Sequence, residues 1–176
     1  PEAAETGTVP LYRSTSFPTG WVQQADLLTS SAVTDPSVFY YDDTWWMFTS
    51  TITHDTLRLF YANELAGPWQ EHPRSPLVEG DSNIARPGGR VIEVNGRLLR
   101  IAQDDHPYYG NQVRAFEISA LSRTDYSETE TPTSPLLTAS GSGWNASGMH
   151  QLDAWRKDAT TWIAAVDGMS AEVIYR

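Results

Sequence analysis

The sequence predicts an all-β fold: an incomplete β-propeller-like array of about three to four blades, built from antiparallel four-stranded sheets. Three observations predict it. A pattern of short apolar segments and polar turns returns after roughly fifty residues, a period typical of propeller blades. β-branched and aromatic residues dominate these segments, and the chain holds seven Trp and eight Tyr. Two-residue polar turns separate the segments, and Asn95-Gly96 is the strongest hairpin signal among them.

The repeats follow one another within a single expected domain, residues 1–176. The clearest copy starts at Asp35-Pro36 and the next at Arg86-Pro87. Segments rich in Pro, Ser, Thr and Gly, at 73–83 and 131–148, are the expected connections between blades. The blades are expected at 1–30 (the end of one blade), 31–80 and 81–140 (two whole blades) and 141–176 (most of a fourth).

Within the blades, apolar runs bounded by turns predict short strands. Hairpin turns are expected at Asp42-Asp43, Asn95-Gly96 and Lys157-Asp158, and only 115–121 could carry a turn of helix. The strands are expected over 8–14, 21–27, 36–41, 45–52, 57–62, 69–72, 87–94, 97–102, 112–118, 126–130, 149–156, 161–166 and 171–176.

Composition argues against several classes of function. The formal charge of −10 argues against nucleic acid and against an anionic membrane surface, because both are bound by clustered Lys and Arg. An acidic surface suits a neutral or cationic ligand, although it more often serves solubility alone. The chain has no cysteine, its histidines lack metal-ligand spacing, and phosphate-loop and dinucleotide motifs are absent. We therefore expect no metal and no cofactor.

Three polar residues hold comparable places in successive repeats. Asp35, Arg86 and His150 each stand at, or close to, the start of a blade. The first strand of every propeller blade lines the central channel, so equivalent positions meet there although they are distant in sequence. The repeat therefore predicts that these three side chains converge on one polar axial site.

Several short motifs, in order along nearly the whole chain, resemble known propellers. The Asp-Pro-x-x-Phe opening at Asp35, with its acidic turn and aromatic second strand, resembles the five-bladed furanosidase-type glycosidases such as glycoside hydrolase family 43. More narrowly, the set resembles the N-terminal propeller of plant glucosamine inositolphosphorylceramide transferases and bacterial relatives. The motifs are Leu11-Tyr12-Arg13, Phe17-Pro18, Trp21, Thr34-Asp35-Pro36, 57–61, Gly67-Pro68-Trp69, 85–90, Ala102-Gln103-Asp104 and 144–150.

The resemblance implies a carbohydrate-related domain that acts on or binds a sugar. It also implies that Pro1-Glu2 stands at the end of the second strand of a blade. On that alignment the first blade and the opening of the second are lacking. A second copy, or another chain that completes the propeller, is then an expected partner, because incomplete blades leave edges uncovered.

Asp35 is the expected general base, since a carboxylate at the channel end of an inner strand can activate water. Alternatively, Asp-Pro simply starts a strand. A glycosidase needs a second carboxyl group to protonate the leaving oxygen. Asp104 is the expected acid, and Glu2 and Asp167 are further candidates near the ends of second strands. The alternative is that Asp104 is a solvated loop residue and Asp167 a turn residue before Gly168.

Arg86, His150 and Trp144 are the expected substrate-binding residues, together with Glu2 and Asp167. The Arg86 guanidinium can bind a sugar hydroxyl or an anion by its fork geometry, or it can neutralise Asp35. His150 can donate a hydrogen bond or a proton, although a lone His is more often structural. Trp144 precedes His150 in a loop and can stack on a ligand.

Two functions from different classes remain open. The first is a glycosidase-like enzyme, and the second is a propeller that binds a carbohydrate or another protein without catalysis. Two carboxyl groups roughly 5–10 Å apart with open space between them favour hydrolysis. A carboxylate paired with Arg86 favours binding.

Overall fold

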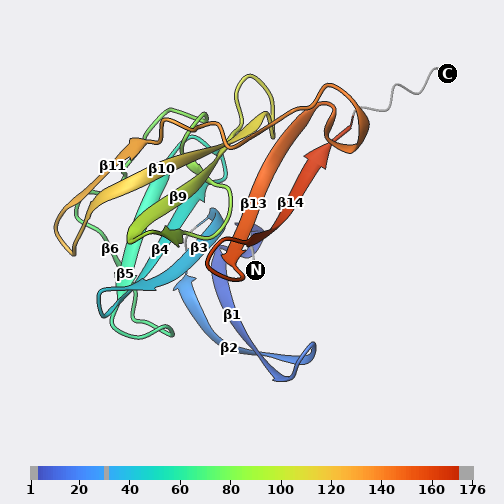
Figure 1. Ribbon diagram of the computed structural model, residues 1–176. Coiled ribbons are helices and arrows are strands. Elements are labelled where there is room, and N and C mark those ends of the chain that lie inside the picture. Colours follow the sequence, from blue (N-terminus) through green and yellow to red (C-terminus); the bar gives the residue numbers. More distant parts are fainter. Residues whose placement is uncertain (1–3, 30–31, 171–176) are drawn as a thin grey trace.

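The structure is a computed structural model that describes residues 4–29 and 32–170 (Figure 1). Over these residues the fold is an all-β, incomplete propeller with four antiparallel sheets, and it holds no α-helix. Two short 3-10 turns, η1 (Ala4–Thr6) and η2 (Gly143–Asn145), are the described helical elements. None of the described helices has the length and apolarity to span a bilayer. The predicted fold class is confirmed.

The first whole blade runs outward from the channel in the order of the sequence. Its strands are β3 (Val33–Tyr41), β4 (Thr44–Thr51), β5 (Leu57–Ala62) and β6 (Gln70–Glu71). Asp42 and Asp43, at φ 47° and 54°, form the left-handed hairpin turn between β3 and β4 that the sequence predicts. Six of the eight residues of β4 are buried, because this strand has neighbours on both edges and sheets on both faces.

The second whole blade consists of more separate strands than the first. It contains β7 (Arg86–Pro87), β8 (Ile92–Val94), β9 (Arg97–Asp104), β10 (Gln112–Leu121), β11 (Tyr126–Glu130) and β12 (Leu137–Thr138). The predicted strand over 87–94 is wrong, because Gly88 and Gly89 interrupt it. The helical turn considered over 115–121 is also wrong, since these residues belong to β10.

Each whole blade also packs against a two-stranded sheet, and Figure 1 shows one of these sheets to the right of the whole blades and the other below them. One consists of β1 (Thr8–Ser16) and β2 (Thr19–Thr29), and the other of β13 (Gly148–Arg156) and β14 (Trp162–Met169). The strands of both sheets are longer than the strands that the sequence predicts. The strand predicted at 171–176 lies outside the described residues.

Apolar side chains fill the space between neighbouring sheets. Trp46, Phe48 and Leu59 of the first blade pack against Leu98 and Ile118 of the second. A second cluster, which includes Val9, Leu27 and Met47, joins the β1–β2 hairpin to the first blade, and a third, which includes Ile101, Val113 and Met149, joins the second blade to β13. Three apolar layers therefore hold the sheets face to face and bring their inner strands together.

Candidate functional site

Arg86 lies at the centre of the polar site. It occupies the short inner strand β7, and its side chain is only 8% exposed. Its Nε donates a hydrogen bond to Oδ2 of Asp35 over 2.5 Å, and Nη1 donates to Oδ2 of Asp105 over 3.2 Å. Burial alone would lower the pKa of Arg86, but the hydrogen bond to Asp35 and that residue's charge outweigh burial and raise it. The guanidinium is therefore a fixed cation held between two carboxylates.

The backbone at Asp35 aims this carboxylate at Arg86. Asp35 has φ 47°, a left-handed conformation that is uncommon outside glycine. The pairing of β3 with β4 is irregular between Thr34 and Ser37, so Asp35 and Pro36 form a bulge. Such strained positions persist where the surrounding structure fixes them, and they are frequent at functional sites. The side chain stays 25% exposed, so a ligand can reach it.

Asp105 provides the second carboxylate of the site. Its Oδ1 accepts a hydrogen bond from the backbone N–H of Gly110 over 2.9 Å. Its Oδ2 lies 3.1 Å from Nδ1 of His54, which also lies 3.3 Å from Nη1 of Arg86. Sequence reasoning missed both residues. Asp105 is the neighbour of the candidate Asp104, whereas His54 lies in a loop after β4 and no sequence pattern marks it.

Asp104 does not join the site, which corrects the expectation that it faces the channel mouth. Its side chain is 1% exposed, and its Oδ2 accepts hydrogen bonds from Gln112 and Arg114 over 2.7 and 2.9 Å. Successive side chains of a strand point to opposite faces. Asp104, the last residue of β9, is therefore buried, and Asp105 takes the place expected for it.

His150 lies between an acid and a phenol. Its Nδ1 lies 2.6 Å from Oδ2 of Asp167, and its Nε2 lies 2.5 Å from the hydroxyl of Tyr109. A carboxylate only accepts hydrogen bonds, so Nδ1 donates to Asp167 and Nε2 is the atom that pairs with the Tyr109 hydroxyl. The Tyr109 ring is 4.9 Å from the Arg86 guanidinium carbon and 4.9 Å from the His150 ring. Tyr109 therefore joins the two halves of the site.

We call these residues the axial cluster: Asp35, His54, Arg86, Asp105, Tyr109, His150 and Asp167. The structure brings Asp35, Arg86 and His150 together in it from three different sheets, and Asp167 with them. Trp144 lies close by, because its ring covers Gly168 next to Asp167, and it is 59% exposed. Glu2 lies outside the described residues.

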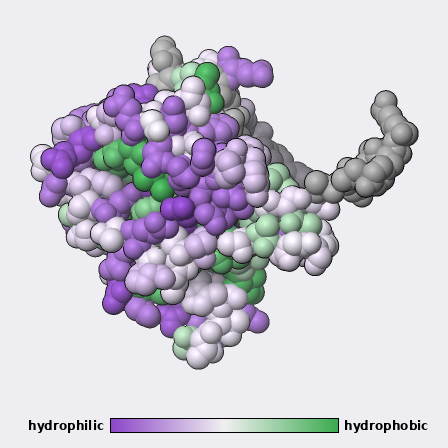
Figure 2. All heavy atoms as spheres, turned by 90° about the horizontal axis from the view of Figure 1, so that it is seen from above, coloured by the Kyte–Doolittle hydropathy of each residue, from purple (hydrophilic) through white to green (hydrophobic). Residues whose placement is uncertain are grey.

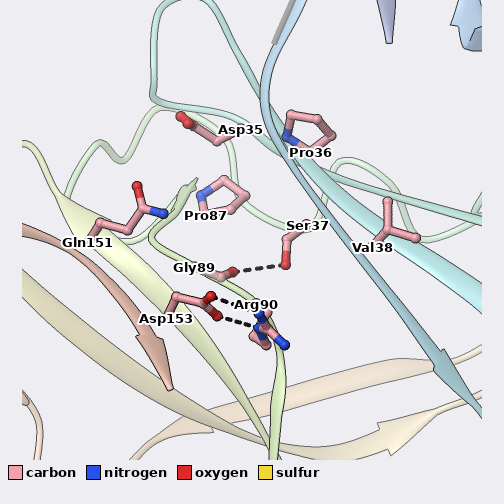
Figure 3. Close-up of a pocket in the computed structure, with 9 residues that line it drawn as sticks. All are labelled: Asp35, Pro36, Ser37, Val38, Pro87, Gly89, Arg90, Gln151 and Asp153. Carbon is pink, nitrogen blue, oxygen red and sulfur yellow. Dashed lines mark hydrogen bonds and ion pairs between the residues drawn. The ribbon is translucent and has the colours of Figure 1, made fainter. Parts of the chain in front are cut away.

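A cavity of about 460 Å³ extends from Asp35 along the inner strands (Figure 3). Ser37 donates a hydrogen bond to the carbonyl oxygen of Gly89 over 2.9 Å, and Arg90 is paired with Asp153. Dashed lines mark both interactions in Figure 3. Pro87 and Gln151 also line this space. No group of three or more acidic, His or Cys side chains within 4–29 and 32–170 is arranged to hold a metal ion. The cavity and the axial cluster together form a polar site of a size that suits a small ligand.

Comparisons of the sequence identify the relatives of this chain. The family model described as "Glucosamine inositolphosphorylceramide transferase 1, N-terminal" matches residues 1–169. Glucosamine inositolphosphorylceramide transferase 1 of Oryza sativa subsp. japonica is 32% identical over 96% of this chain and 24% of its own length. The protein of the same name from Arabidopsis thaliana is also 32% identical, over 96% of this chain and 23% of its length. The chain therefore spans about a quarter of these relatives.

Comparison of the structure identifies similar folds. A family 117 glycoside hydrolase from the marine bacterium Zobellia galactanivorans has a TM-score of 0.53 at 12% identity, over 94% of this chain and 58% of the other. A thermostable family-43 glycoside hydrolase has a TM-score of 0.46 at 12% identity, over 75% of this chain and 40% of the other. The family match confirms the resemblance that the sequence motifs indicate.

Proposed function

The chain belongs to the family of the N-terminal domain of glucosamine inositolphosphorylceramide transferase 1, and from this premise we propose that it binds a sugar at the axial cluster without hydrolysing it. One observation carries the proposal. Two of the three carboxylates of the axial cluster, Asp35 and Asp105, are held by the same guanidinium of Arg86, and the third, Asp167, is paired with His150. That arrangement is suited to recognition more than to hydrolysis.

Hydrolysis needs two carboxyl groups with different tasks and room for the glycosidic bond between them. In the axial cluster, Arg86 occupies the space between Asp35 and Asp105. A sugar that entered between the two carboxylates would have to displace a buried cation from both partners, and an unpaired buried charge is costly. The geometry therefore argues against these two residues as a catalytic acid and base.

Binding needs exposed polar atoms beside an apolar surface, and the site offers both. Within the described residues, Oδ1 of Asp35 makes no hydrogen bond, and it can accept one from a sugar hydroxyl or ammonium group. Tyr109 and Trp144 expose large parts of their rings near His150 and Asp167. An aromatic face can pack on the C–H face of a pyranose while the polar groups fix its orientation. The relatives' name includes glucosamine, which makes a glucosamine-containing glycan the first ligand to test.

The test is a titration of the protein with glucosamine and glucose, followed by calorimetry or ligand-observed NMR. Asp35→Asn is expected to weaken binding by about tenfold or more, since a hydrogen bond to a charged group contributes about 1.5–3 kcal/mol. Asp42→Asn is the matched control, because Asp42 is an aspartate with the same φ of 47° in an exposed turn. It should bind as the unaltered protein does.

The same proteins are then incubated with aryl glycosides, and release of the aryl group is measured. The proposal expects no turnover by any of them. Turnover that Asp35→Asn abolishes would replace the binding function with a hydrolytic one. Absence of binding to either sugar by the unaltered protein would refute the proposed function.

A further inference from the structure

Three side chains of the axial cluster form a row of hydrogen bonds that ends on a tyrosine. Oδ2 of Asp167 lies 2.6 Å from Nδ1 of His150, and Nε2 of His150 lies 2.5 Å from the hydroxyl oxygen of Tyr109. Sugar binding does not require this order of carboxylate, imidazole and hydroxyl. The same order activates nucleophiles in enzymes, where a base takes the proton of a hydroxyl group and a third group orients the base.

The geometry equips His150 to act as the base. Because Nδ1 donates its hydrogen to Asp167, Nε2 of the neutral ring carries the lone pair, and this atom faces the Tyr109 hydroxyl. The Asp167 carboxylate holds the ring in place and stabilises the imidazolium that forms once Nε2 has taken a proton. His150 lies on β13 and Asp167 on β14, which are paired strands of one sheet, so regular elements position both groups.

Tyr109 is accessible, held in place and close to a cation. It stands in the loop between β9 and β10 and is 48% exposed, so a small molecule can reach it. The next residue, Gly110, lies so close to His150 that an added Cβ atom would come within 3.0 Å of the His150 Cβ. The Tyr109 ring lies 4.9 Å from the guanidinium carbon of Arg86. A fixed cation stabilises the negative charge that develops when a nucleophile adds to a carbonyl group.

We propose that Tyr109 is the nucleophile of an acyl-transfer reaction on a carboxylic ester, with His150 as its general base and Asp167 as the residue that positions His150. This activity goes beyond sugar binding. It needs a single group to move protons, whereas glycoside hydrolysis needs two carboxyl groups. His150 is such a group, while the guanidinium of Arg86 holds the other two carboxylates of the cluster.

The reaction has two steps. In the first, the phenolic oxygen of Tyr109 bonds to the carbonyl carbon of the ester while Nε2 of His150 takes the phenolic proton. The bond from that carbon to the alcohol oxygen breaks, and the alcohol leaves with the proton from Nε2. In the second, water attacks the acyl group on Tyr109 and gives a proton to Nε2. The bond to the phenolic oxygen breaks, Tyr109 regains its proton from Nε2, and the carboxylic acid leaves.

Cleavage of para-nitrophenyl acetate tests the proposal, because the nitrophenol that it releases is coloured. The unaltered protein should release nitrophenol faster than buffer does, and Tyr109→Phe should lower this activity by about 100-fold, at the lower end of the range for general acid–base catalysis. Tyr108→Phe is the matched control and should keep the activity, because Tyr108 is the neighbouring phenol and is 50% exposed. Release no faster than in buffer, or unchanged release by Tyr109→Phe, would overturn the proposal.

The acyl intermediate identifies the nucleophile in the unaltered protein. Acid quenching at early times, followed by mass spectrometry of the peptides, should find an acetyl group on Tyr109. Few other side chains compete for the reagent, since the chain has no cysteine and a single lysine, Lys157. Equal acetylation of Tyr108 and Tyr109 would contradict the proposal, and this comparison needs no variant that could misfold.

Chemical rescue and a double-mutant cycle separate the roles of His150 and Asp167. His150→Ala should lower acetylation of Tyr109 by about 100-fold, and free imidazole should restore part of it, because a small base replaces the lost ring. A purely structural role would give no recovery. Asp167→Asn should lower the activity of the unaltered protein and have no further effect in His150→Ala, since Asp167 acts through His150. An equal effect in both backgrounds would contradict the positioning role. None of these outcomes depends on sugar binding.

Discussion

Individual charges decide where the site of this protein forms. Arg86 is buried, and its partners are Asp35, in a strained bulge of β3, and Asp105, the residue that follows β9. Neither carboxylate would stay close to the other without the cation, because like charges repel. Arg86 therefore organises the axial cluster as well as contributing to it.

Arg86→Met is expected to lower the free energy of unfolding by about 3 kcal/mol or more, since removing one member of a buried ion pair leaves uncompensated charge. Arg97→Met is the control, because the Arg97–Glu117 pair, at 3.2 Å, is on the surface and such pairs contribute at most about 1 kcal/mol. Urea denaturation compares the two. Similar losses in both variants would mean that the Arg86 pairs have no special importance for stability.

Sequence reasoning located the axial cluster but erred by one residue within it. The positions of Asp35, Arg86 and His150 could be inferred because they recur with the repeat. The choice between Asp104 and Asp105 depends on where β9 ends, and the predicted strand stopped at 102 while β9 runs to Asp104. Strand ends shift by a residue or two without changing an apolar pattern, and each shift moves a side chain to the opposite face.

Single glycines and aromatic residues decide how the sheets approach one another. Gly88 lies against the backbone of Ala102 and Gln103, where a Cβ atom would come within 2.8 Å. A Cβ atom on Gly89 would lie 1.9 Å from the carbonyl oxygen of Leu152. These contacts explain why the predicted strand 87–94 divides into β7 and β8. The interruption depends on contact with β13, about sixty residues later in the sequence. No local sequence pattern reveals such a contact.

Gly89→Ala should lower the free energy of unfolding by more than about 1 kcal/mol, because it adds a clash with β13 to the strain of a backbone at φ 151°. Gly96→Ala is the matched change at a turn, with φ 77° but no atom within 4 Å of the new Cβ. Gly96→Ala therefore loses only the stability that a side chain costs at a positive φ, with no clash added. Chemical denaturation should therefore rank Gly89→Ala as the more damaging, and the reverse order would contradict the close approach of the sheets.

Phe48→Ala should cost about 3–5 kcal/mol, because Phe48 is fully buried between the two whole blades and its loss leaves a cavity. Phe17→Ala removes a ring of the same size that is exposed in the β1–β2 turn. We expect it to change stability by less than about 0.5 kcal/mol. Equal effects in denaturation experiments would mean that the layer between the blades is not a packed core.

Acid should weaken the outer part of the first blade. Glu71 on β6 accepts hydrogen bonds from Arg58 on β5 over 2.8 and 2.6 Å, and these bonds lower the pKa of Glu71 below its ordinary 4.5. A depressed pKa in the folded state gives stability that is present above pH 4.5 and is lost as the pH falls through the folded-state pKa. Glu71→Gln should remove this part of the pH dependence of unfolding. An unchanged acid profile would show that the pair contributes nothing.

The whole molecule combines a strongly acidic surface with apolar faces at its two ends. The face in Figure 2 is largely hydrophilic, with small separate hydrophobic patches. The formal charge of −10 makes two copies of the chain repel one another.

The bond between the backbones of Leu152 and Gly88 has a consequence for local opening. The amide of Leu152 donates to the carbonyl oxygen of Gly88 over 2.8 Å, so within the described residues β13 is the strand whose backbone is hydrogen-bonded to the second blade. The rates of amide hydrogen exchange should therefore differ between the two strands of this hairpin. The Leu152 amide will exchange slowly with deuterium, while outward-facing amides of β14 will exchange within the shortest times that can be sampled.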